Sequence, residues 1–103
     1  MITNTIQELF DRKSVRAFTD QEILPEEKEL ILKAAAAAPT AGNQQLYTIL
    51  DITDQELKDK LAETCDHQPF IAKAKMVLIF CADFQKWYDA FQAIDCESRK
   101  PGP

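Results

Sequence analysis

The sequence predicts a mixed chain of four helices and two strands that forms only part of a larger fold. Apolar residues at helical spacing mark the helices, and runs of β-branched, aromatic or apolar residues mark the strands, at Tyr47–Ile52 and Lys75–Ala82. The second run is almost continuously apolar, which is typical of a strand covered on both faces. Because two strands do not make a stable sheet alone, the sheet needs more chain or a partner.

The composition fits one globular domain. The chain has 103 residues, 46% of them hydrophobic, and a net charge of −5, so we expect neither nucleic acid nor an acidic membrane as a partner. The first residues lack the pattern of a signal peptide, and the longest apolar run, Met76–Ala82, is too short to span a bilayer. Three widely spaced cysteines indicate free thiols in a reducing compartment. We therefore expect a single domain over residues 1–103, located in the cytoplasm.

Two shortages exclude common kinds of site. Gly42 and Gly102 are the only glycines, so neither a G-x-G-x-x-G dinucleotide loop nor a Walker loop is present. His67 is the only histidine, which argues against a Ser-His-Asp triad and a zinc site. Cys65 lies two positions before His67 without a second ligand pair, and we interpret both as surface or packing residues. We expect no metal and no catalytic side chain.

The first predicted helix runs from about Asn4 to Asp11, where Thr5 and Glu8 have the spacing of a capping box. The second begins with a proline at its first position and covers about Pro25–Ala38, and Pro39 ends it. The residues expected on its buried face are Leu30, Ile31, Ala34, Ala35 and Ala38.

Three further helical segments are predicted in the second half of the chain. A helix opens with a capping box at Thr53 and extends to about Thr64, with Leu57 and Leu61 expected to be buried. A short helical turn covers Pro69–Lys73, and the last helix covers about Phe84–Ile94. That helix carries the aromatic residues Phe84, Trp87, Tyr88 and Phe91. So much aromatic surface must be covered by something.

A basic segment, Arg12–Phe18, follows the first helix in a chain that is acidic overall. The helix dipole favours cations at a helix C-terminus, which explains Arg12 and Lys13 but explains Arg16 less well. In an extended segment positions 12, 14 and 16 point to one side. Two guanidinium groups and the hydroxyl of Ser14 would then suit a phosphate group.

An amide loop, Thr40–Gln45, joins the second helix to the first strand. Asn43, Gln44 and Gln45 each carry a donor pair and an acceptor on one planar group. Such groups suit the edge of a planar, hydrogen-bonding ring. The alternative is a polar connector without a ligand.

These two segments, in this order and spacing, resemble the N-terminal half of the nitroreductase-like, FMN-dependent oxidoreductases. The match rests on Arg12–Phe18, on the helix end Ala38-Pro39 and on Thr40–Gln45 before a strand, and it covers essentially the whole chain. The resemblance implies an α+β fold in which helices wrap a mixed sheet, and an intertwined homodimer with FMN at its interface. Family members are about twice as long, so the chain is expected to be a truncated domain that needs a second half or a second copy.

The resemblance also implies roles for individual residues. The basic segment would hold the FMN phosphate, and the amide loop would hydrogen-bond the flavin ring. Arg16 and Asn43 would favour the reduced flavin, whose negative charge lies near N1 and O2. NAD(P)H would reduce FMN and leave before a small acceptor enters, such as a nitroaromatic compound, a quinone or free flavin. The residues assigned to FMN are Arg12, Lys13, Ser14, Arg16, Asn43 and Gln45.

Two alternatives stay open. The chain could be a non-catalytic module that binds flavin or assembles through the aromatic helix Phe84–Ile94, or a family relative with other chemistry, such as reductive dehalogenation or flavin breakdown. Lys86 is placed on the exposed face of that last helix. We therefore expect its replacement to leave flavin binding unchanged.

Overall fold

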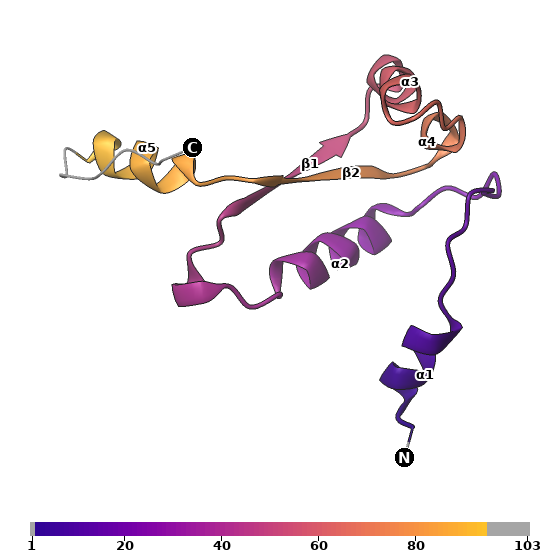
Figure 1. Cartoon of the computed structure of the whole chain (residues 1–103), viewed down its shortest axis with the longest axis horizontal. Coiled ribbons are helices and arrows are strands. Elements are labelled where there is room, and N and C mark those ends of the chain that lie inside the picture. Colours follow the sequence, from indigo (N-terminus) through magenta and orange to yellow (C-terminus); the bar gives the residue numbers. More distant parts are fainter. Residues whose placement is uncertain (1, 95–103) are drawn as a thin grey trace.

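The structure is a computed structural model that describes residues 2–94 (Figure 1). These residues form five α-helices and two strands, with a short 3-10 turn in the amide loop. In chain order the elements are α1 (Asn4–Asp11), α2 (Pro25–Ala36), η1 (Ala41–Asn43), β1 (Tyr47–Ile52), α3 (Gln55–Thr64), α4 (Phe70–Lys73), β2 (Val77–Ala82) and α5 (Gln85–Ala93). All predicted helices and both strands are therefore confirmed, although α2 ends two residues earlier than expected.

The sheet consists of β1 and β2, which pair antiparallel from Tyr47 opposite Ala82 to Ile52 opposite Val77. Residues 2–94 contain no parallel pair, so the mixed sheet that the resemblance implies would need strands beyond these two. The prediction that β2 is covered on both faces is wrong for this chain, because the side chain of Phe80 is 62% exposed. An almost continuously apolar strand such as β2 is suited to being covered on both faces by further elements of a larger fold.

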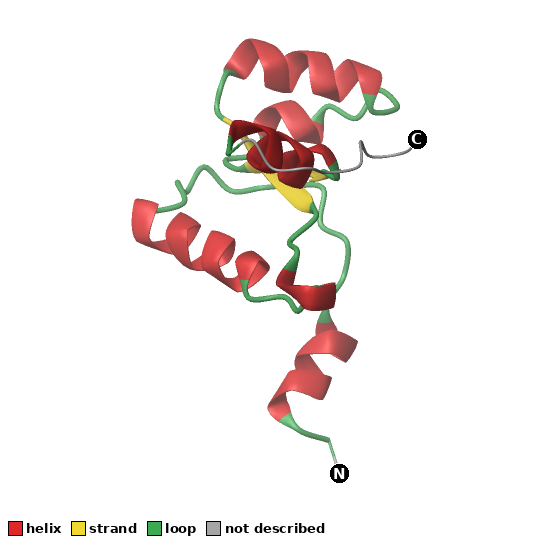
Figure 2. Ribbon diagram, turned by 90° about the vertical axis from the view of Figure 1, so that its left-hand side faces the viewer, coloured by secondary structure: helices red, strands yellow, loops and turns green. Residues whose placement is uncertain are grey.

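Three of the helices lie at the two ends of this ribbon. At one end α3 packs on α4, and at the other α5 continues from β2 (Figure 1). Helix α2 runs beside the sheet, to which an ion pair between Lys28 and Asp51 ties it. Helix α1 stands away from the other elements, as both views show (Figure 2).

The helix starts differ in detail from the predicted capping boxes. Thr3 caps α1 by accepting from the backbone N–H of Ile6 at 3.3 Å, and Asp54 caps α3 by accepting from that of Glu56 at 3.1 Å. The sequence predicts capping boxes that begin at Thr5 and Thr53, and both predictions are wrong. Thr3 and Asp54 carry side-chain oxygens that accept from the free backbone N–H groups as well as those of Thr5 and Thr53 would.

The buried faces also differ from the expected ones. On α2, Leu30 is 67% exposed, whereas the part-buried residues are Lys28, Leu32 and Ala35. On α3, the buried residues are Lys58 and Ala62 rather than their neighbours at 57 and 61, and the Nζ of Lys58 donates to the Ala74 carbonyl at 3.2 Å. A shift of one position rotates a helix by about 100°. The expected apolar faces are therefore covered only in part, at Ala35 and Leu61.

This open arrangement lacks the core of an ordinary domain. Among residues 2–94 only Lys58 and Ala62 are buried. The Cα radius of gyration is 18.0 Å, whereas a compact domain of this length has about 13 Å. The accessible surface is 8850 Å², against roughly 5,900 Å² for a compact monomer of this mass. The difference is as large as an obligate subunit interface.

Candidate functional site

The basic segment is extended and exposed. Arg12 ends α1 with φ −62° and ψ 148°, and its backbone N–H donates to the Glu8 carbonyl at 3.1 Å. The side chains of Arg12, Lys13, Ser14 and Arg16 are all exposed. No ion pair within residues 2–94 involves them. The extended conformation agrees with the prediction, so these polar groups are available to an anion.

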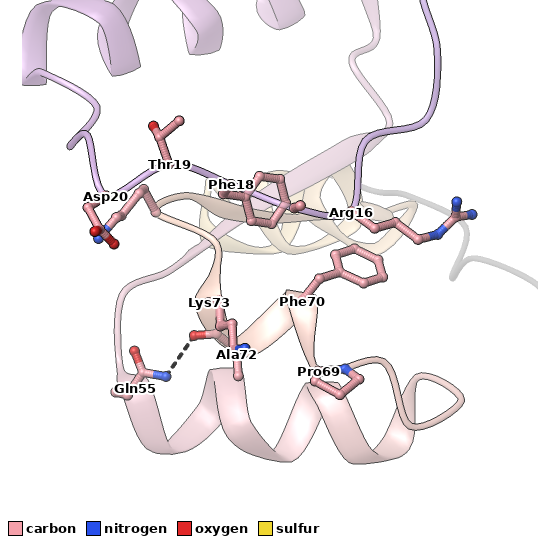
Figure 3. A pocket seen from close by; sticks show the side chains of 11 residues that line it. Arg16, Phe18, Thr19, Asp20, Gln55, Pro69, Phe70, Ala72 and Lys73 are labelled. Atoms are coloured by element: carbon pink, nitrogen blue, oxygen red, sulfur yellow. Dashed lines mark hydrogen bonds between the residues drawn. The ribbon is translucent and has the colours of Figure 1, made fainter.

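Arg16 borders an open groove of about 700 Å³ between residues 16–20 and α4 (Figure 3). Phe18 and Phe70 both line it and contact each other as a tilted pair, with ring centroids 6.2 Å apart and an interplanar angle of 58°. The Nε2 of Gln55 donates to the Ala72 carbonyl at 2.9 Å and joins α3 to α4 below the rings. The side chain of Arg16 extends past Phe70, away from the ring pair.

The amide loop has a tight left-handed backbone. Gly42, Asn43 and Gln45 have φ values of 57°, 53° and 52°. A non-glycine residue in this region costs about 1–3 kcal/mol, so the surrounding structure must hold it there. Within the loop, the backbone N–H of Gln45 donates to the Thr40 hydroxyl at 3.2 Å, and the Gln45 amide donates to Asn43 Oδ1 at 3.2 Å. The two candidate amides are thus held against each other.

The start of α5 holds the far end of this loop. The Nζ of Lys86 donates to the carbonyls of Gln45 at 2.8 Å and Tyr47 at 2.7 Å, and it lies 5.5 Å from the centroid of the Tyr47 ring. The indole N–H of Trp87 donates to the Gln44 carbonyl. The prediction that Lys86 is on an exposed face is therefore wrong: the side chain is part-buried and bonded to the loop.

Sequence reasoning missed these contacts because 39 to 43 residues separate the partners. No local pattern shows that a lysine in the first turn of a helix will bond to a loop that precedes a distant strand. The available signal was weaker. An amide loop and an aromatic helix flank the two predicted strands, and antiparallel pairing of those strands brings the loop and the helix to the same end.

Asp83 joins the same network at the end of β2. It accepts from the Thr48 hydroxyl, and its Oδ1 accepts from the Lys86 backbone N–H at 3.2 Å. The hydrogen bond from Thr48 is the main reason why the pKa of Asp83 lies below its ordinary value of 3.8. Desolvation opposes this shift, and the backbone N–H and charge of Lys86 lower the pKa further. Asp83 is thus an anchor of the junction between the strands and α5.

Acid is expected to loosen this junction. Because the pKa of Asp83 is lowered on folding, its stabilising contribution is complete above its ordinary pKa of 3.8 and is lost as pH falls through the lower folded value. Trp87 is the only tryptophan, so its emission reports on α5 during a titration to low pH. We expect a transition below about pH 4 that Asp83→Asn removes. Identical titrations of the two proteins would contradict the assignment.

An open groove of about 780 Å³ lies between the amide loop and α5. Its aromatic wall comes from α5, where Trp87 and Phe91 have ring centroids 6.1 Å apart. The lining residues are Gly42, Asn43, Gln44, Leu46, Phe84, Trp87 and Phe91. A planar apolar ligand fits such a surface, with amide groups at its edge.

The structure does not bring the basic segment and the amide loop together within one chain. The basic segment lies at the end of the ribbon that carries α3 and α4, whereas the amide loop and α5 lie at the opposite end (Figure 1). The two groups of predicted FMN residues therefore belong to two separate surfaces of this chain.

Fold and site together define a partial α+β domain that presents a basic segment at one end and an amide loop at the other. The sequence model described as the nitroreductase family matches residues 9–96. The chain belongs to the nitroreductase family.

Individual relatives agree with this assignment. A protein named FMN reductase (NAD(P)H) from Bacillus subtilis (strain 168) is 35% identical over 85 residues, which are 82% of this chain and 34% of that protein. Among solved structures, NfrA2 of B. megaterium matches with a TM-score of 0.86 at 33% identity, over 95% of this chain and 40% of its own. The NADPH:FMN oxidoreductase from Vibrio harveyi complexed with NAD+ matches with a TM-score of 0.82 at 31% identity, over 85% of this chain and 38% of its own.

The comparisons confirm the predicted nitroreductase-like fold. They also show that the chain spans about a third of the length of the curated relatives it matches. The exposed faces of α2, α3 and β2 are consistent with a fold of which this chain is the N-terminal part. Within residues 2–94, no helix has both the length and the apolar character needed to cross a membrane.

Proposed function

We propose that the chain is the N-terminal part, a single truncated domain over residues 1–103, of an FMN-dependent oxidoreductase of the nitroreductase type. The enzyme transfers hydride from NAD(P)H to small acceptors such as nitroaromatic compounds, quinones or free flavin. Bound FMN supplies the redox chemistry, and the protein binds it, orients it and sets its electrostatic surroundings. The family match over residues 9–96 carries this proposal, because it includes both segments that could bind FMN.

The donor sets of the two segments fit FMN. Exposed guanidinium, ammonium and hydroxyl groups on one extended stretch suit its phosphate. Exposed amides beside an aromatic groove suit the polar edge and the face of its ring. Arg16 and Asn43 are the groups that we assign to the charge on the reduced ring. The FMN-binding residues proposed here are Arg12, Lys13, Ser14, Arg16, Asn43 and Gln45.

The site is completed by two chains, in this proposal. Within one chain the two segments lie at opposite ends of the two-strand ribbon, so a single copy cannot apply both to one FMN unless it rearranges (Figure 1). A homodimer places the basic segment of one copy beside the amide loop of the other. The exposed apolar faces of α1, α2 and β2 would be covered by that copy and by the second half of the fold.

The localisation and other partners are inferred from composition. An acidic chain with free thiols at Cys65 and Cys81 suits the cytoplasm. Neither nucleic acid nor a membrane is proposed as a partner. The third cysteine, Cys96, lies outside the described residues.

A visible absorption spectrum tests the proposal directly. The purified chain is mixed with FMN, desalted and scanned, and its mass in solution is measured by light scattering. Retained flavin bands with the mass of two chains support the proposal, and bleaching by NAD(P)H then tests the activity. A colourless protein would leave the family assignment intact but overturn the claim that this chain binds FMN.

The alternative of a non-catalytic assembly module has one observation in its favour. Most large apolar residues of the last predicted helix are exposed in this chain, namely Phe84, Trp87 at 41%, Phe91 and Ile94 at 71%. Self-association without flavin in the same experiment would favour this alternative, because it separates assembly from cofactor binding.

A further inference from the structure

Four consecutive backbone carbonyls at the exit of the amide loop accept hydrogen bonds from one short segment. The carbonyls of residues 44 to 47 are bound, in order, by the indole of Trp87, the ammonium of Lys86, the backbone N–H of Asp83 and again the ammonium of Lys86. The segment 83–87 therefore holds the backbone immediately after the residues assigned to the flavin.

Lys86 is the central group of this arrangement. Its Nζ bridges the carbonyls of Gln45 and Tyr47 at 2.8 and 2.7 Å, across the backbone of Leu46. Its own backbone N–H donates to Asp83, so the start of α5 fixes the position from which the side chain reaches the loop. A charged donor makes stronger hydrogen bonds to carbonyl oxygens than a neutral donor does.

The loop needs such support because its conformation is unfavourable. Asn43 and Gln45 are both left-handed, and their exposed side chains bond to each other. The backbone N–H of Gln45 bonds to the Thr40 hydroxyl within the same loop. The Gln45 carbonyl also accepts the backbone N–H of Tyr47 at 2.8 Å, which closes a tight turn. The bonds to this carbonyl therefore fix the orientation of the Gln45 backbone, from which its side chain extends.

We propose that Lys86 is a positioning residue for the amide loop: by holding the carbonyls of Gln45 and Tyr47, it keeps Asn43 and Gln45 in the geometry that binds the flavin ring. This inference rests on the proposed FMN site. Lys86 itself contacts no cofactor in the proposal and acts through the loop. Trp87 adds a second hold through the Gln44 carbonyl.

The test uses the full chain with Lys86→Met and Lys86→Arg, and Lys60→Met as a matched control on the exposed surface of α3. FMN affinity is measured by quenching of flavin fluorescence. Lys86→Met is expected to weaken FMN binding about tenfold, the loss typical of a charge-assisted hydrogen bond. Lys86→Arg, which keeps a charged donor, is expected to restore most of the affinity, and Lys60→Met to leave it unchanged. Wild-type affinity in Lys86→Met would overturn the proposal.

A double-mutant cycle shows whether Lys86 acts through the loop. On an Asn43→Ala background the added effect of Lys86→Met is expected to shrink, because the group being positioned is absent. Fully additive losses of affinity would overturn the proposed route. They would assign Lys86 to general stability or to a direct contact.

Amide hydrogen exchange tests the positioning without any flavin. In Lys86→Met the backbone N–H groups of Gln45 and Tyr47 are expected to exchange about tenfold faster, while those of α3 stay unchanged. Unchanged exchange in the loop would overturn the proposal even if FMN binds. If the wild-type chain binds no FMN but the loop exchanges faster in the variant, the proposed function fails and the positioning role stands.

Discussion

Arg16→Ala is expected to weaken FMN binding by roughly 10- to 100-fold, the range that follows from losing one or two charge-assisted hydrogen bonds. The guanidinium group is exposed at the edge of the groove beside Phe18 and Phe70, and none of the ion pairs within residues 2–94 involves it. Its removal therefore breaks no ion pair of the described chain. The loss would appear in the FMN dissociation constant, measured by fluorescence quenching.

Two controls separate the guanidinium geometry from charge alone. Arg16→Lys keeps the charge and loses the planar fork, so we expect an intermediate affinity. Lys60→Ala removes one exposed cation from α3 that does not line the groove beside Arg16, and should leave FMN binding unchanged. Equal losses in Arg16→Ala and Lys60→Ala would mean that only net charge matters. Unchanged affinity in Arg16→Ala would remove Arg16 from the site.

The elements of this chain could be predicted because their signals are local. Pro25 at the first position of α2, the β-branched run of β1 and the apolar run of β2 each occupy a few consecutive residues. The faces of the helices could not be predicted equally well. An apolar residue such as Leu30 was expected to be buried, but in this chain the residue that meets the sheet is Lys28, paired with Asp51.

That difference has a physical cause. A periodic apolar pattern shows that a face will be covered, but it does not show by which chain. Helix α2 has apolar residues on more than one side, and the described chain covers only the side with Lys28, Leu32 and Ala35. The exposed apolar side of α2 is therefore suited to packing against protein surface outside residues 2–94.

The candidate site divides in the same way. The chemistry of Arg16 and Asn43 is visible in the sequence, because residue type and local spacing determine it. The bonds from Lys86 to the carbonyls of Gln45 and Tyr47 depend on contacts between residues about 40 positions apart. Only the pairing of β1 with β2 places these residues together, so the positioning groups became apparent from the structure alone.

Complementation between two inactive variants gives the most direct test of a site shared by two chains. One variant carries Arg12→Ala and Arg16→Ala, and the other carries Asn43→Ala and Gln45→Ala. Each alone is expected to bind no measurable FMN, because every site in its homodimer lacks one of the two segments. The two variants are co-expressed with different tags, and the mixed pairs are isolated by successive purification on both tags.

The mixed pair should bind one FMN for every two chains. One of its sites combines two damaged segments, whereas the other combines the intact amide loop of the first variant with the intact basic segment of the second. The wild-type pair should bind two, so the absorbance of retained flavin per chain is halved. This result follows only if the segments act between copies, which agrees with their positions at opposite ends of the two-strand ribbon (Figure 1).

The other outcomes are equally informative. The two segments of one chain could instead form a site within that chain after a rearrangement. In that case no flavin is retained, because every chain in the mixed pair carries one damaged segment. If either variant binds FMN alone, the altered residues do not hold it. Because both damaged segments are exposed and lie outside the contacts that join α3 to α4 or β1 to β2, a variant that fails to bind should still fold, which circular dichroism would verify. Recovery of half the wild-type flavin would therefore identify the dimer as the unit that binds FMN.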